Sequence, residues 1–232
     1  MTDFGLKIYN TSGDTQIDSL YQNYITVETG SFTCPNSRGF NSVSFSSSIS
    51  DSYTPIIAFT SSVYHYISLY SLNYSGGNFT GFTYGHTPGI SETIYYAVYL
   101  ESDAISPTSD TYGMNIYNSS GELVFTNNGN DYFNILTVDA TDYSGTYPDQ
   151  PSPNYVTVQD ADNNYFALYP WLASRFVVGE PPPLVQYSYS MGMNYIDSTT
   201  IRVGSYYWSA AVEAGTPPGF TGVGTLIELK RT

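Results

Sequence analysis

Cysteine, histidine and basic residues are all scarce in this sequence, and each scarcity excludes a class of chemistry. Cys34 is the one cysteine among 232 residues, so an intrachain disulfide or a thiolate metal cluster cannot form. With only His65 and His86, neither a histidine zinc site nor a catalytic triad is expected. Six Lys and Arg residues against twenty Asp and Glu residues give a net charge of -14, whereas nucleic-acid binding needs basic residues that neutralise phosphates. We therefore expect no cofactor, no bound metal and no nucleic-acid partner.

Long apolar runs are missing as well. Segment 94–100 is an apolar stretch of strand length, far short of the roughly 20 residues that a membrane helix needs. The first residues show no basic stretch followed by an apolar one, so no signal peptide is expected. These features predict no membrane insertion, and the single cysteine fits synthesis in a reducing cytoplasm.

Apolar residues are nevertheless plentiful and occur in short segments. Hydrophobic residues make up 41% and charged residues 11% of the chain, the opposite of the balance that produces disorder. Gly, Pro, Asn and Ser separate short alternating runs, and no stretch has sustained helical periodicity, which is typical of an all-β sandwich or barrel. The expected strands cover residues 43–45, 56–60, 63–70, 79–84, 94–100, 135–138, 155–158, 165–169, 176–178, 185–189, 200–203, 206–212 and 224–229.

One segment occurs twice. Residues 4–14 return at 112–122 with identical Gly, Ile, Tyr, Asn, Ser and Gly positions and conservative changes between them. The spacing is that of a domain, so the sequence predicts two tandem, related β-sandwich modules over residues 1–105 and 106–232. Each copy alternates apolar and polar residues and then turns, and we expect each module to open with a β-hairpin. The hairpin turns are expected at Asn10 and Gly13, and at Asn118 and Gly121.

The residues that could carry chemistry each have a simpler interpretation. Alternation places His65 with apolar neighbours as a structural histidine, and His86 lies in a segment that we interpret as a turn. Residues 160–164 have the Asp-x-Asp-x-Asn spacing that opens a calcium loop but lack its glycine and its distant glutamate, so a solvated turn is the better interpretation. Nothing places two carboxylates together for glycoside cleavage. No catalytic residue is assigned.

Tyrosine is the distinctive residue, with 25 copies. Tyr64, Tyr66 and Tyr70 alternate along one strand face, and Trp171 lies near a run of three prolines. Tyrosine offers a large rigid contact area with a polar tip, which suits a binding surface. It also suits strands and can simply fill a core. Both interpretations, contact surface and scaffold, stay open for these four residues.

The opening residues 3–13, an aromatic-Gly-apolar strand followed by Asn-x-Ser-Gly, resemble the start of small tail proteins of tailed bacteriophages. The aromatic segments 94–100 and 206–212 are similar to the closing strands of those proteins. The resemblance covers about a dozen residues in each half and includes no catalytic motif. It implies a virion protein of the tail tip, baseplate or a fibre, made in the host cytoplasm, without enzymatic activity. The expected partners are other tail proteins, further copies of the chain in a homotrimer, and a host surface glycan or protein.

Three other functions stay open from the sequence. A capsid decoration or head fibre protein would look much the same. A glycan-degrading enzyme of the tailspike type would usually need a longer repetitive β-helix and a carboxylate pair. A cell-surface adhesin would need a secretion signal.

Overall fold

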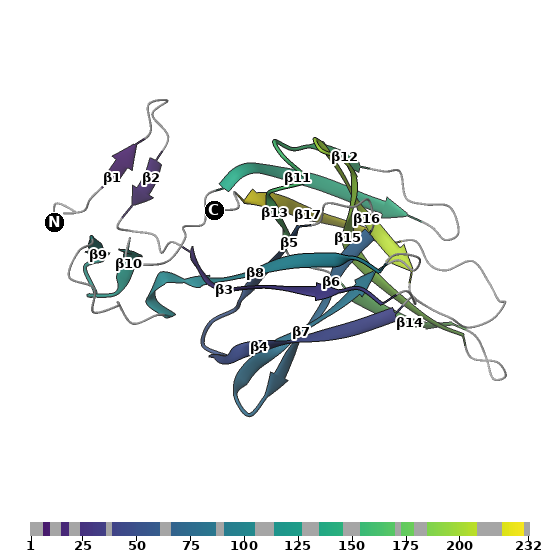
Figure 1. The fold of residues 1–232 in the computed structure, drawn as a ribbon, viewed down its shortest axis with the longest axis horizontal. Helices are drawn as coiled ribbons and strands as arrows, with labels where there is room; N and C mark the ends of the chain where they lie inside the picture. The colour runs from purple at the N-terminus through teal and green to yellow at the C-terminus, as the bar shows by residue number, and fades with distance from the viewer. Residues whose placement is uncertain are drawn as a thin grey trace.

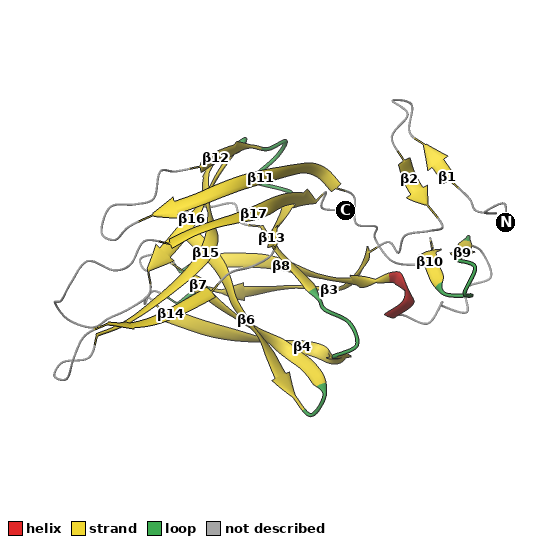
Figure 2. Ribbon diagram, turned by 180° about the vertical axis from the view of Figure 1, so that it is seen from behind, coloured by secondary structure: helices red, strands yellow, loops and turns green. Residues whose placement is uncertain are grey.

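The computed structural model describes residues 7–9, 15–18, 24–35, 39–60, 66–86, 91–104, 114–126, 135–145, 154–169, 173–178, 185–207 and 220–229. In these ranges the chain forms antiparallel β-strands and one short 3-10 turn, η1 (Ser102–Ala104), so the predicted all-β class is confirmed. Most strands form two large sheets that pack against each other (Figure 1). Two small hairpins lie outside these sheets, at one end of the long axis (Figures 1 and 2).

The first half of the chain contributes three strands to each large sheet. Strands β3 (Tyr24–Thr33), β8 (Thr93–Glu101) and β5 (Ile56–Thr60) pair in that order in the six-stranded sheet. Strands β4 (Gly39–Ser50), β7 (Asn78–His86) and β6 (Tyr66–Ser75) pair in that order in the seven-stranded sheet.

The second half repeats this order. Strands β11 (Ile135–Gly145), β17 (Phe220–Leu229) and β13 (Tyr165–Tyr169) continue the six-stranded sheet, and β12 (Asn154–Thr157), β16 (Thr200–Tyr207) and β15 (Val185–Asp197) continue the other. Six strands of each half can be numbered by their order along the chain, leaving out β14. In both halves the first, third and sixth of these strands lie in the six-stranded sheet, and the second, fourth and fifth lie in the seven-stranded sheet. Strand β14 (Ala173–Val178), which pairs with β15, is the addition in the second half. The repeat in the sequence therefore corresponds to a repeat in strand order.

The prediction of two separate sandwiches over residues 1–105 and 106–232 is not confirmed, because both sheets run through both halves. Strand β5 pairs with β13 where Phe59 lies opposite Phe166, and β6 pairs with β15 where Ile67 lies opposite Met193. The core between the sheets draws its residues from both halves. The physical reason is that the inner strands are apolar. All of β5 except Ile56 is buried, and an unpaired apolar edge of this kind is unfavourable in water.

Alternation along the strands explains the core. Aromatic rings fill its centre, where Phe82 lies with its ring centroid 5.7 Å from Phe59 and 5.2 Å from Tyr96, both in edge-to-face geometry. Side chains on the opposite face of β5 and β8 form a second cluster in which Ala58 and Ala97 are fully buried. The centre of the six-stranded sheet is thus buried on both faces, and each large apolar side chain there contributes about 1.5–3 kcal/mol.

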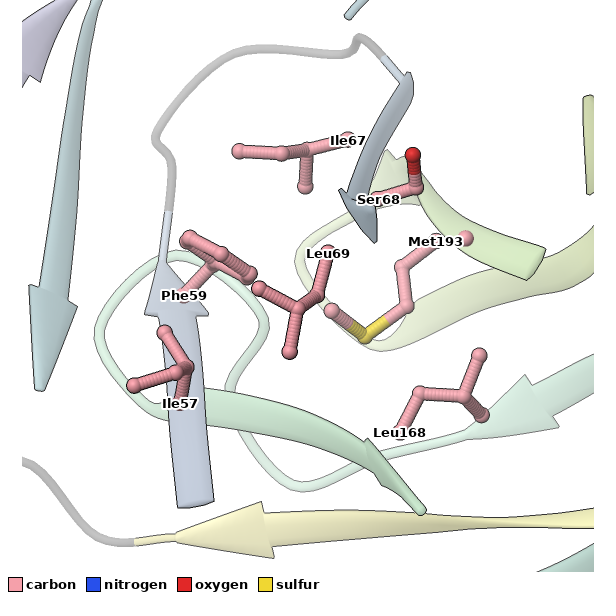
Figure 3. A pocket seen from close by; sticks show the side chains of 8 residues that line it. Ile57, Phe59, Ile67, Ser68, Leu69, Leu168 and Met193 are labelled. Carbon is pink, nitrogen blue, oxygen red and sulfur yellow. The ribbon is translucent and has the colours of Figure 1, made fainter. Parts of the chain in front are cut away.

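A small cavity marks the junction of the two halves. Figure 3 shows its lining, with Ile57 and Phe59 from β5, Ile67 and Leu69 from β6, Leu168 from β13 and Met193 from β15 among the residues around it. Its volume is about 10 Å³, room for about one water molecule. The cavity is far smaller than a substrate pocket, so the junction is a packed interface between the halves.

Candidate functional site

The repeated segment folds as a hairpin in both halves. Strands β1 (Lys7–Tyr9) and β2 (Thr15–Asp18) pair with each other, as do β9 (Asn115–Tyr117) and β10 (Leu123–Thr126). In the second copy, the Asn118 side-chain oxygen accepts hydrogen bonds from the backbone N–H groups of Ser120 and Glu122, both at 2.9 Å. Gly121 has a φ of 83°, the left-handed conformation that favours glycine. Asn118 and Gly121 thus occupy the predicted turn, while Asn10 and Gly13 lie outside the described residues.

The second hairpin is attached to the sandwich through η1. The Ser102 hydroxyl, which is buried, donates to the Leu123 carbonyl oxygen at 2.8 Å. Ile116, Val124 and Phe125 form a small apolar cluster of their own. Two large side chains of this segment remain exposed, Met114 at 40% and Tyr117 at 49%. The hairpin is therefore tied to η1 and also presents apolar surface to solvent.

The tyrosines proposed as contact residues have different environments. Tyr64 and Trp171 lie outside the described residues. Tyr66 is only 7% exposed, which corrects its assignment to a contact surface, because its ring packs closely against Gly192 at the junction of the halves. Tyr70 is half-buried, and its ring lies 4.2 Å from that of Phe40, which is itself partly exposed.

Other aromatic and apolar side chains are more exposed than Tyr66 and Tyr70. Tyr74 projects near the β6–β7 turn, where its hydroxyl donates to Asp51 at 2.8 Å and its ring contacts Phe79 edge-on. Strand alternation could have found Tyr155, because its neighbour Val156 is the apolar residue of that strand. The exposed large side chains of the described residues are Phe40, Tyr74, Tyr95, Met114, Tyr117, Tyr155 and Ile196.

The Asp160–Asn164 segment is a turn closed by its own hydrogen bonds. Asp160 Oδ1 accepts hydrogen bonds from the backbone N–H groups of Asp162 and Asn163, both at 3.2 Å. The Asn164 side chain is buried and donates to Glu228 at 2.8 Å. Glu228, fully buried, also accepts from the backbone N–H groups of Gln159 and Asp160. These carboxylates bind N–H groups, and within the described ranges no group of three His, Cys, Asp or Glu side chains could hold a metal ion.

Glu28, on the edge strand β3, is a second carboxylate that accepts several hydrogen bonds. It accepts hydrogen bonds from the Tyr96 hydroxyl at 2.8 Å and from the Ser46 backbone N–H at 2.8 Å. Burial, followed by the hydrogen bond to Glu28, raises the pKa of Tyr96 to about 12. Tyr96 therefore stays protonated and donating at neutral pH, and Glu28 ties β3 and β8 to β4.

Cys34 and His86 are both buried. Burial, with a smaller effect of nearby Glu92, raises the pKa of the Cys34 thiol to about 12, so it is not a reactive nucleophile at neutral pH. His86 corrects the turn interpretation: it is the last residue of β7, fully buried, and its Nε2 lies 3.2 Å from the Asn41 side-chain nitrogen. His65 lies outside the described residues.

Comparisons of the chain with protein-family models, curated proteins and solved structures found no match. In the described ranges no helix is long and apolar enough to span a membrane. What the described residues offer is surface: a partly exposed hairpin beside the sandwich and aromatic side chains on the sheets.

Proposed function

We propose that this chain is a structural virion protein of a bacteriophage tail, in the tip, baseplate or a fibre, and that it acts through assembly and host-surface contact. The observation that carries the proposal is the repeated hairpin, whose sequence resembles the start of such tail proteins. Neither copy of the hairpin pairs with a strand of the two large sheets, so the strand pairing of the sandwich does not involve the hairpins. A segment that is repeated but kept outside the sheets supports a role in contacts with other chains.

The exposed residues of the second hairpin support the same role. Met114 and Tyr117 leave apolar surface beside a segment anchored through Ser102. Met and Tyr are among the residues enriched in protein interfaces. We propose that the hairpins contact other tail proteins and further copies of this chain, as expected for a homotrimer.

Charge supports assembly through apolar contacts. A net charge of -14 makes copies of the chain repel one another in solution. Association then depends on matched apolar surfaces, because the chain has only six basic residues for ion pairs. This composition favours a protein that associates only at specific sites in a particle.

Labelling of intact particles tests the proposal. Antibodies against the purified chain, coupled to gold, should decorate the tail of the phage that encodes it, and the chain should be found in purified particles. Decoration of the head would replace the tail assignment with the capsid decoration or head fibre alternative. Absence from particles, or turnover of a host polysaccharide by the purified chain, would contradict the proposal.

A further inference from the structure

The duplicated strand order provides an internal comparison between the two halves. In the seven-stranded sheet, the register aligns Val43 and Phe82 of the first half with Val156 and Ile201 of the second. All four side chains pack in the core between the sheets. Because side chains alternate along a strand, the next residue on each strand faces outward. We call the side chains at these neighbouring positions, on the face turned away from the core, the outward row of each half. The registers allow the two outward rows to be compared position by position.

The outward row of the first half consists of small hydroxyl groups that bind one another. Ser42 and Thr83 are register partners on β4 and β7, and their hydroxyl oxygens lie 2.9 Å apart. The Thr83 hydroxyl also donates to the Asn73 side chain at 2.8 Å. The polar groups of this row satisfy one another, as an ordinary exposed sheet face requires.

The outward row of the second half consists of larger groups that are unpaired. Tyr155 on β12 is the register partner of Arg202 on β16, and Arg202 is the partner of Asn194 on β15. Tyr155 is 58% exposed, and Arg202 and Asn194 are half-buried. In the described structure none of the three side chains makes a hydrogen bond, and Arg202 makes no ion pair although the chain has twenty acidic residues.

We propose that Tyr155, Arg202 and Asn194 form a binding site for a carboxylate-bearing sugar of a surface glycan. The guanidinium group of Arg202 can hold a carboxylate through two parallel hydrogen bonds. Opposed residues in an antiparallel pair have Cβ atoms about 4.5–5.5 Å apart, so the exposed ring of Tyr155 can cover the apolar face of the same sugar. The Asn194 amide can both donate to and accept from a sugar hydroxyl.

Charge on the rest of the molecule favours this ligand over other anions. The net charge of -14 disfavours anions over the molecule as a whole, and Arg202 is one of only six basic residues that can hold a single negative group. One arginine cannot neutralise a polyanion such as nucleic acid. A second copy of the chain would bring its own charge of -14 to the same face, whereas an acidic sugar brings one carboxylate.

This inference deepens the proposed function, since a host-surface role would supply the glycan, but its test uses the purified full chain alone. The probes are the methyl glycosides of glucuronic, galacturonic and N-acetylneuraminic acid, each with its carboxyl-reduced counterpart, measured by saturation-transfer NMR and titration. At least one acid should bind, and its reduced form should bind more weakly by roughly tenfold or more.

Variants locate the binding. Arg202→Gln and Tyr155→Ser should each weaken binding of that acid about tenfold, while Ser42→Ala, in the matching row of the first half, should leave it unchanged. Both substituted side chains are at least partly exposed, and unchanged thermal unfolding would confirm that the variants fold. Absence of binding by all three acids, equal binding of a reduced form, or an unaffected Arg202→Gln variant would overturn the inference.

Two further results separate this inference from the proposed function. If Arg202→Gln alters sedimentation of the chain while no sugar binds, the row is an interface between copies and the glycan site is wrong. If the chain is found in phage tails but binds none of the sugars, only the sugar site is refuted.

Discussion

Replacing Gly192 by alanine tests whether the two halves form one cooperative unit. Gly192 lies on β15 next to Met193, which pairs with Ile67 of β6 in the other half. A Cβ atom at position 192 would lie 2.5 Å from the Ile67 carbonyl oxygen and 2.6 Å from the Tyr66 ring. Ordinary contacts begin at 3.4 Å. The carbonyl belongs to the backbone of β6, so relief requires the two strands, and with them the two halves, to move apart.

The size of the effect follows from two opposing contributions. Overpacking a well-packed site costs about 1–3 kcal/mol. Alanine recovers about 0.5–1 kcal/mol relative to glycine in a strand, because its unfolded chain has less conformational freedom. We therefore expect Gly192→Ala to lower the free energy of unfolding by about 1–2 kcal/mol, or Tm by about 2–8 °C for a domain of this size.

The unchanged chain and the Gly192→Ala variant are heated and followed by calorimetry and circular dichroism. Each should show a single unfolding transition for the sandwich, and the variant's transition should lie at the lower temperature. Gly76→Ala is the control. It lies in the β6–β7 turn with a φ of 57° and nothing within 4 Å of an added Cβ, so it should cost about 1–2 kcal/mol of backbone strain without pressing on the strands that join the two halves. Two separate transitions, with only one displaced by Gly192→Ala, would refute the shared core.

Three more predictions concern burial and charge. Glu228→Ala should reduce the free energy of unfolding, measured by denaturant titration, by about 3 kcal/mol or more. The reason is that two backbone N–H groups and the Asn164 amide lose the carboxylate that accepts their hydrogen bonds. Asp162→Ala is the control, because Asp162 is exposed and its replacement should change the free energy of unfolding little. Burial raises the pKa of Tyr96 to about 12 and also raises the pKa values of Tyr84 and Tyr195. The folded state then holds these protons more tightly than the unfolded state, so stability should persist below pH about 10 and fall as the pH rises toward 12; tyrosinate absorbance that grows without unfolding would contradict this. Raising the salt concentration should keep or tighten the proposed homotrimer in sedimentation experiments, because screening weakens repulsion between acidic copies. Dissociation in salt would point to ion pairs instead.

The sequence predicted the strands and the repeat more readily than the way in which the halves join. The short apolar runs between turn residues predicted β5 and β13, whose bounds match the expected segments 56–60 and 165–169. Alternation shows which face of a strand is buried but not which strand lies at its edge. The pairing of Phe59 with Phe166 could therefore not be derived from periodicity, and each half was assigned its own sandwich.

The candidate site was harder to predict because exposure depends on neighbours in space. Tyr66 alternates with apolar residues just as an exposed tyrosine would, but the junction of the halves covers it. His86 stands beside Thr87 and Pro88, a sequence that favours a turn, whereas β7 continues as far as His86. The row of Tyr155, Arg202 and Asn194 draws on three strands, and only the register brings these residues together.

Joining the halves through β5 and β6 also affects how the chain folds during synthesis. The first half is made first. Its inner strands β5 and β6 pair with β8 and β7 on one side, but their partners on the other side, β13 and β15, follow only with the second half. The hydroxyl of Tyr195, for example, donates to the Phe59 carbonyl 136 positions earlier. Contacts this distant in sequence form slowly, and unpaired apolar edges are prone to aggregate in the meantime. The second half of another copy has the same strands in the same order, so its β13 and β15 can pair with the free edges of β5 and β6. High concentrations of newly made chain therefore favour domain-swapped pairs, which a slower rate of synthesis would reduce.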